Sequence, residues 1–341
     1  MEQYDGSRVT GVVDNWSQSL SEFDDRMGAI KVREDQAVLI GESTNSSTEM
    51  ALASVKITDS GPEVQNSQNF TNRYRSVDGI KIGDGYFIPT TQKDNYTTEW
   101  LEVWNVDESG NFNKVKEISA PNSEGTDGLA YTPTFSEKWL IRADNNDFSI
   151  FDVSDPANVT LENELSSTTA NNVHGDMSIT EDGYLVTPTS YGLQTLDVDL
   201  PNTITLVEVK ETYDGYGATF VKVSSRNTVI ALYDSSYLPL AEWKVDGDGS
   251  LTSYRVSTFE FDGYSPAPVH ITQGTVVVAR TSDYRIGFAN RRPGLYSDHP
   301  VVWDFPRTID NFVDDEHTVG TIVDGWFVGG RDATAYAGRL V

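Results

Sequence analysis

The sequence contains no cysteine, which excludes disulfide bonds, thiolate metal ligands and a cysteine nucleophile. It also lacks any apolar run of about eighteen residues or more, so no segment is predicted to span a membrane as a helix. Residues 1–6 have neither the basic nor the apolar region of a secretory signal. No Gly-x-Ser-x-Gly elbow, phosphate-binding loop or Rossmann glycine pattern occurs, so no linear motif points to an enzyme.

Positive charge is scarce. The 341 residues include 52 acidic against 25 basic side chains, which gives a formal net charge of −27. This charge repels nucleic acid phosphates and anionic lipids, so neither is predicted as a partner. The acids are spread along the chain, and arginine outnumbers lysine. The composition is similar to that of haloarchaeal proteins, which tolerate such self-repulsion in concentrated salt, and an ordinary acidic protein is the alternative.

A short apolar strand pattern recurs at intervals of 45 to 53 residues. Many copies open with an aromatic residue after a glycine or a turn. A repeat of this length with about four strands per unit is typical of β-propeller blades. The seven copies are Gln36–Glu42, Gly85–Thr91, Lys138–Asp144, Gly183–Thr189, Thr228–Asp234, Thr275–Thr281 and Gly325–Arg331.

The neighbours of each copy repeat as well. Another predicted strand precedes it across a tight turn, as at Gly83–Gly85, and a third strand follows, often with a Val-Asp ending as in Leu101–Asp107. A fourth strand alternates polar and apolar residues, as in Ile204–Lys210, which suits an outer strand with one face in water. Each repeat therefore predicts a four-stranded antiparallel unit.

The two ends of the chain complete the seventh unit. The last repeat has three predicted strands, ending with Ala333–Val341, and Arg8–Asp14 is an unassigned run of the outer-strand type. Pairing these segments would remove two open sheet edges. The prediction is an all-β fold, a single-domain seven-bladed β-propeller of four-stranded blades closed by its N-terminal strand. The blades are expected near residues 20–70, 75–120, 125–168, 173–212, 215–258, 264–308 and 315–341 with 8–14, and a protruding loop is expected within residues 285–305.

One stretch resembles a known repeat. The sequence SIFDVSDPANVTL at Ser149–Leu161 resembles the LVIVD-type repeat of prokaryotic propeller proteins, in which a strand ends in an Asp-Val-Ser-Asp-Pro turn. Trp104–Asp107 and Trp243–Asp246 share only its Val-Asp ending. The resemblance implies the propeller fold and no particular activity.

In the predicted propeller, two sets of links share one face around the central channel. One set leads into each first strand and is rich in Asp-Gly pairs; the other joins second and third strands and is rich in tyrosine and serine. Such side chains suit recognition of a protein or glycan, although Asp-Gly is also a common turn pair that satisfies its own backbone. The predicted binding residues are Asp127, His174, Asp176, Asp214, Tyr216, Tyr237, Asp262, Tyr264 and His317.

Two of these residues, His174 and His317, fall at equivalent positions of the fourth and seventh repeats. Histidines near carboxylates suit a metal site or an acid–base pair. No ligand spacing such as His-Glu-x-x-His occurs. No cofactor is therefore predicted, and a cation at the channel mouth is the alternative.

The repeat, the charge and the missing secretory signal together favour a protein that is made in the cytoplasm and works outside it. The leading prediction is a non-enzymatic component of a halophilic archaeal virus, a capsid, turret, spike or tail decoration on the virion surface that attaches to the host. Its predicted partners are other virion proteins and a host surface glycoprotein or glycan, without nucleic acid or membrane insertion. Two alternatives remain open, a cytoplasmic haloarchaeal enzyme acting on a sugar or lactone, and an intracellular protein-interaction scaffold.

Overall fold

The computed structural model describes most of the chain. The described residues are 12–70, 79–89, 99–120, 128–131, 138–144, 147–166, 173, 177–211, 218–225, 227–233, 239–258, 267–271, 275–280, 285–296, 299–310, 320–331 and 333–340. Within these ranges every regular element is a β-strand, which confirms the predicted all-β class. The same ranges hold no helix long and apolar enough to cross a membrane.

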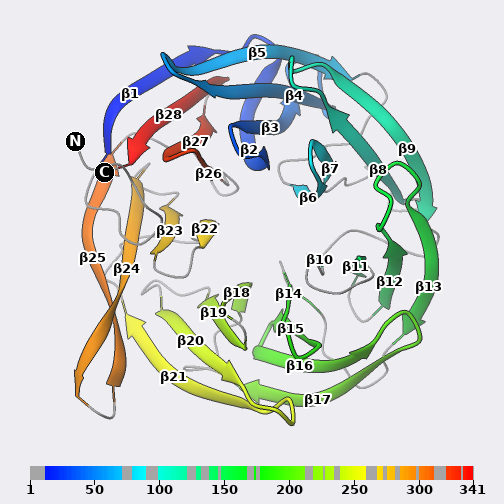
Figure 1. Ribbon diagram of the computed structural model, residues 1–341, viewed down its shortest axis with the longest axis vertical. Coiled ribbons are helices and arrows are strands. Elements are labelled where there is room, and N and C mark those ends of the chain that lie inside the picture. The colour runs from blue at the N-terminus through cyan, green and yellow to red at the C-terminus, as the bar shows by residue number, and fades with distance from the viewer. Residues whose placement is uncertain are drawn as a thin grey trace. The chain divides into compact units, whose positions relative to one another are not determined.

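The strands form seven four-stranded sheets, counted over the described residues (Figure 1). Six sheets use consecutive strands. They are β2 (Phe23–Arg33), β3 (Gln36–Ser43), β4 (Ser46–Thr58) and β5 (Gly61–Phe70); β6 (Gly79–Gly83), β7 (Tyr86–Pro89), β8 (Glu99–Val106) and β9 (Phe112–Ala120); β10 (Gly128–Tyr131), β11 (Trp139–Asp144), β12 (Asp147–Asp152) and β13 (Thr160–Ser166); β14 (Ser178–Ile179), β15 (Tyr184–Thr189), β16 (Gly192–Asp199) and β17 (Thr203–Glu211); β18 (Ala218–Ser225), β19 (Thr228–Tyr233), β20 (Pro239–Val245) and β21 (Leu251–Thr258); and β22 (Ala267–Ile271), β23 (Thr275–Arg280), β24 (Arg285–Tyr296) and β25 (His299–Asp310).

The seventh sheet has the order β1-β28-β27-β26 and combines the two ends of the chain. It consists of β1 (Val12–Ser19), β26 (Thr321–Val323), β27 (Trp326–Arg331) and β28 (Thr334–Leu340). β1 runs antiparallel to β28, from the pair Val12 and Leu340 to the pair Ser19 and Thr334. The predicted strand Arg8–Asp14 overlaps β1 only at its end, because residues 8–11 lie outside the described residues and the strand continues to Ser19. The polar sequence after Asp14 hid this extension, since only Trp16 packs against a core there.

The chain divides into two compact units. One comprises residues 1–119, 265–291 and 304–341, and the other comprises residues 120–264 and 292–303. In the first unit, the alternation of β3 sends its side chains into two cores. Val38 and Ile40 share a core with Trp104 of β8, whereas Ala37 and Leu39 share one with the seventh sheet. Burying one large aliphatic side chain of this kind stabilises the fold by roughly 1.5–3 kcal/mol.

The second unit is built by the same alternation. Leu185 of β15 belongs to a core with Phe148 of β12, and the next residue, Val186, belongs to a core with Val229 and Trp243 of the following sheet. β3 and β15 thus bury apolar side chains on both faces, which explains why these repeats read as largely apolar runs.

The sixth sheet departs from the prediction. In place of a protruding loop within residues 285–305, the chain forms β24 and β25, two strands of 12 residues each (orange in Figure 1). The prediction rested on the sequence Arg291-Arg292-Pro293-Gly294 and on the length of residues 285–305, which was judged too long for one plain hairpin. A proline is compatible with a strand where no ladder hydrogen bond needs its nitrogen, so the signal was not decisive.

Candidate functional site

All the residues predicted to bind a partner lie outside the described residues. They are Asp127, His174, Asp176, Asp214, Tyr216, Tyr237, Asp262, Tyr264 and His317. The strands that flank them are described, so the sheet end from which each segment departs is known. Their assignment to one binding surface stays a prediction.

Strand pairing shows that the two kinds of link begin at a common end of a sheet. Ala218, the first residue of β18, pairs with Tyr233, the last residue of β19. The segment with Asp214 and Tyr216 leads into β18, and the segment with Tyr237 leaves β19, so both join the sheet at this pair. In each sheet, the first strand starts and the second strand ends at the same end of the sheet. We call this end the 'link end'.

In the first sheet both links at the link end are described. The backbone N–H of Thr44, in the turn after β3, donates to the carbonyl oxygen of Glu22 at 3.0 Å. The Thr44 hydroxyl donates to the Ser21 carbonyl at 3.1 Å. The incoming link and the turn are therefore tied together, which gives this end a fixed backbone.

Three glutamates gather around this link end, and sequence reasoning missed all of them. Glu22 Oε2 accepts a 2.8 Å hydrogen bond from the Ser67 hydroxyl, and Glu42, the penultimate residue of β3, is only 7% exposed. Oε2 of Glu49 is buried and accepts no hydrogen bond in the described part of the chain. They were missed because they lie in or beside strands, whereas the search followed Asp-Gly pairs. The signal was available at Glu42, where an acid ends the apolar run QAVLIGE.

The link end of the fourth sheet is polar in its interior. Thr187 and Thr189 of β15 are fully buried, and the Thr187 hydroxyl has no hydrogen-bond partner within the described residues. Gln194 of β16, the pairing partner of Thr187, is also fully buried. Hydroxyl and amide groups form hydrogen bonds that aliphatic side chains cannot form, so this end of the sheet differs chemically from an aliphatic core.

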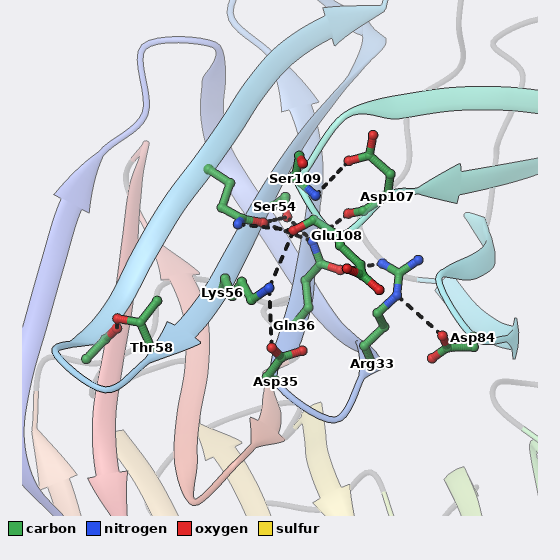
Figure 2. Close-up of polar contacts among 12 residues, drawn as sticks. Arg33, Asp35, Gln36, Ser54, Lys56, Thr58, Asp84, Asp107, Glu108 and Ser109 are labelled. Atoms are coloured by element: carbon green, nitrogen blue, oxygen red, sulfur yellow. Dashed lines mark hydrogen bonds and ion pairs between the residues drawn. The ribbon is translucent and has the colours of Figure 1, made fainter.

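The opposite end of the first sheet carries a dense polar cluster (Figure 2). Gln36 Nε2 donates to Ser54 Oγ at 2.8 Å and to the Asp107 carbonyl at 3.1 Å. Arg33 Nε lies 3.4 Å from Asp84 Oδ2, and Lys56 Nζ lies 3.5 Å from Asp35 Oδ2. The cations here already have carboxylate partners, and the contacts tie the β8–β9 turn to the neighbouring sheet. We therefore assign this cluster a structural role.

The turn itself lowers the pKa of its first residue. The side-chain amide of Asn111 donates to Asp107 Oδ2 at 2.9 Å, and the backbone N–H groups of Asn111 and Ser109 donate to Oδ1. These hydrogen bonds, that of the Asn111 side chain first, stabilise the carboxylate and hold the pKa of Asp107 below its usual value.

In the second unit, the β20–β21 turn likewise contacts the neighbouring sheet. The Tyr184 hydroxyl donates to the Gly247 carbonyl at 3.0 Å, and the Thr195 hydroxyl donates to the Gly249 carbonyl at 2.7 Å. The matching glycines, Gly110 and Gly249, have φ angles of 85° and 83°, which favour glycine. The turn sequences VDESGN and VDGDGS are thus structural joints between adjacent sheets.

Metal binding finds no support in the described residues, where no group of three or more histidine, cysteine, aspartate or glutamate side chains could hold an ion. The cation considered for the channel mouth would involve residues outside them. The absence of a cofactor accordingly stays a prediction.

Solved structures share this fold, although no protein-family model and no curated protein matches the sequence. A protein from Lactobacillus plantarum has a TM-score of 0.64 at 14% identity, covering 85% of this chain and 86% of its own. A Bacteroides fragilis protein assigned as a 6-phosphogluconolactonase has a TM-score of 0.62 at 12% identity, with 84% of each chain covered. The periplasmic gluconolactonase of Pseudomonas aeruginosa has a TM-score of 0.62 at 13% identity, covering 85% of this chain and 86% of its own. The fold is that of a β-propeller.

These neighbours contradict the leading functional prediction. Two of them are named for lactonase activity, so the predicted non-enzymatic virion component for host attachment is wrong, and the enzyme alternative is favoured. The prediction was based on the repeat, the charge and the missing secretory signal, and none of these three features tests for catalysis. In a fold of separate sheets, active-site residues can come from several links that are far apart in sequence.

Proposed function

We propose that this chain is a seven-bladed β-propeller, closed by its N-terminal strand, that hydrolyses an uncharged sugar lactone. The observation that carries the proposal is the likeness to two structures named as lactonases over 84% and 85% of this chain. The seven four-stranded sheets and the pairing of β1 with β28 support the blade count and the closure.

Lactone hydrolysis needs three kinds of group. Water attacks the carbonyl carbon, the bond from that carbon to the ring oxygen breaks, and the ring oxygen leaves as a hydroxyl after accepting a proton. A base must take a proton from the water, and an acid must donate a proton to the leaving ring oxygen. Hydrogen-bond donors must stabilise the negative charge that develops on the carbonyl oxygen. Among the proposed site residues, His174 and His317 are the candidates for the base, because histidine titrates near neutral pH. The aspartates would orient the histidines, and the tyrosine hydroxyls would donate to the oxyanion or to the sugar.

The charge of the protein favours an uncharged substrate over a phosphorylated one. The link end of the first sheet carries Glu22, Glu42 and Glu49, and the nine proposed site residues include four aspartates and no lysine or arginine. Phosphate recognition normally uses arginine or lysine, and the net charge of −27 opposes the approach of an anion. A neutral lactone avoids both obstacles.

The test compares two substrates with the purified full chain. We expect hydrolysis of glucono-δ-lactone well above the spontaneous rate, measured as acid release in a pH-stat, and much slower hydrolysis of its 6-phosphate. Added KCl should narrow the difference, because salt screens the repulsion. Single His174→Ala and His317→Ala variants, checked for folding by circular dichroism, should identify the base. The variant that lacks the base should show a large loss of kcat.

Three results would count against the proposal. If neither lactone reacts faster than in buffer alone, the proposed activity is wrong. A preference for the phosphorylated lactone would refute the charge argument and leave lactonase activity standing. Full activity in both histidine variants would refute the proposed base.

A further inference from the structure

The turn between β15 and β16 presents an aromatic ring to solvent. Tyr191 is 61% exposed, more than the two other large hydrophobic residues exposed in the described part of the chain, Val207 at 40% and Val209 at 37%. Those two lie on the outer strand β17, whereas Tyr191 lies at a link end. Single exposed aromatic residues are common on protein surfaces, so a binding role for Tyr191 depends on the structure around it.

The backbone beneath Tyr191 is held in place. The Tyr191 N–H donates to the Thr189 hydroxyl at 3.3 Å, and Thr189 pairs with Gly192 across the turn. Thr189 itself is fully buried. A tyrosine ring has few rotatable bonds, so a ring on a fixed turn loses little conformational entropy when a ligand packs on it.

The incoming link meets the same strand end. Val173, which is 1% exposed, forms an antiparallel bridge with Thr189, two residues from Tyr191. The next residue after Val173 is His174, one of the two proposed bases. The bridge therefore joins the strand end below Tyr191 to the residue that directly precedes the proposed base in the sequence.

From this placement we infer that Tyr191 is a substrate-binding residue whose ring face packs against the sugar ring of the lactone. The inference rests on the proposed function. The negative face of an aromatic ring attracts the weakly positive C–H groups of a sugar, and this contact needs no charge on the ligand. The buried hydroxyls of Thr187 and Thr189 below the turn belong to the same polar link end. Tyr191 would thus favour a ring-closed ligand.

The test distinguishes the contribution of the Tyr191 ring from that of its hydroxyl, and an effect on substrate binding from an effect on catalysis. Tyr191→Ala should raise KM for glucono-δ-lactone by about tenfold, with a smaller effect on kcat, and Tyr191→Phe should stay within about twofold of the wild type in KM. Val209→Ala is the matched control, because it also removes an exposed hydrophobic side chain but lies on β17. Calorimetric titration with gluconolactam, an uncharged analogue without the ester, gives the same comparison without turnover.

Each outcome has a distinct meaning. If the wild type hydrolyses the lactone and Tyr191→Ala leaves KM and the gluconolactam Kd unchanged, the inference is overturned and the proposed function stands. If Tyr191→Phe loses as much as Tyr191→Ala, the hydroxyl rather than the ring makes the contact, and the inference is again overturned. If the wild type neither hydrolyses the lactone nor binds gluconolactam, the proposed function falls, and the inference falls with it.

Discussion

Replacement of Gln36 by leucine should destabilise the protein strongly, although it barely changes side-chain volume. Gln36 is 1% exposed at the start of β3. Its Nε2 donates to Ser54 Oγ at 2.8 Å, and it lies 3.1 Å from both Gln65 Oε1 and the Asp107 carbonyl oxygen. Its Oε1 accepts a 2.5 Å hydrogen bond from Arg33 Nη1. One side chain on β3 thus contacts the three other strands of the first sheet and the β8–β9 turn of the second (Figure 2).

The expected loss follows from these contacts. A net intramolecular hydrogen bond contributes about 1 kcal/mol, and a bond to a charged donor contributes about 1.5–3 kcal/mol. Leucine removes the two N–H donors of Nε2 and the acceptor of the guanidinium, and leaves the Asp107 carbonyl without this donor. The additional apolar surface of leucine offsets part of the loss. We expect the free energy of unfolding to fall by roughly 2–4 kcal/mol.

The measurement is urea unfolding followed by circular dichroism at fixed salt, with the tyrosine and tryptophan fluorescence as a second probe. Gln68→Leu is the matched control, because the same substitution then falls on an exposed position of β5. It should change the free energy of unfolding by about 0.5 kcal/mol or less. Equal effects of Gln36→Leu and Gln68→Leu would refute the claim that the buried amide network stabilises this joint.

Four further predictions address the joints, the closing strand and the charge. Gly249→Ala should cost roughly 1–3 kcal/mol of unfolding free energy, because φ is 83° and the new Cβ would lie 2.7 Å from Tyr184 Cε1, while Gly247→Ala, with no atom within 4 Å, should be nearly neutral. Deletion of residues 1–19 should expose the edge of β28 and cause aggregation, detected by size-exclusion chromatography; a monomeric variant with an unchanged Tm would contradict the closure. The Tm should rise between about 0.01 and 1 M KCl as the screening length falls from about 30 to 3 Å, and a flat or falling Tm would contradict adaptation to salt. The lowered pKa of Asp107 means that its extra stabilisation is present above the usual pKa of aspartate, about 3.9, and is lost as the pH falls through the lowered value. The stability difference between wild type and Asp107→Asn should therefore shrink on acidification below about pH 4, and a constant difference in urea midpoint would refute this linkage.

Much of the strand pattern could be predicted because burial on both faces leaves a clear mark on a sequence. The predicted segments Gln36–Glu42 and Thr228–Asp234 correspond to β3 and β19 within one residue at each end. Strands with one exposed face were harder to place only where their alternation is irregular. β17 alternates between exposed and half-buried residues throughout, and its pattern was still recognised, whereas β1 has an irregular register between Val13 and Trp16 that breaks the alternation. The full length of β24 was not predicted, because a protruding loop was expected around Arg291-Arg292-Pro293-Gly294.

The site was less predictable than the fold, for a physical reason. Turn chemistry and binding chemistry use the same residues, so an Asp-Gly pair in a link indicates a turn whether or not it binds anything. The described turns demonstrate this ambiguity, since Asp107 and Asp248 use their carboxylates to accept hydrogen bonds within their own turns. By contrast, Glu42 sits where the alternation of β3 calls for an apolar residue. An acid that interrupts a buried pattern must be compensated or used, and this makes it more informative than an acid in a link.

The same reasoning explains how the functional prediction failed. Net charge restricts which ligands can approach, but it does not distinguish a binding protein from an enzyme. The charge of −27 supported the prediction of a halophilic surface, and the virion was inferred from this charge together with the repeat and the missing secretory signal. Only the prediction of a halophilic surface concerns electrostatics. The net charge of −27 does predict which of two similar substrates is preferred, because a phosphorylated lactone and its uncharged form differ in little besides charge. A measured preference between these two substrates, and its dependence on salt, therefore tests what the composition of this chain can actually determine.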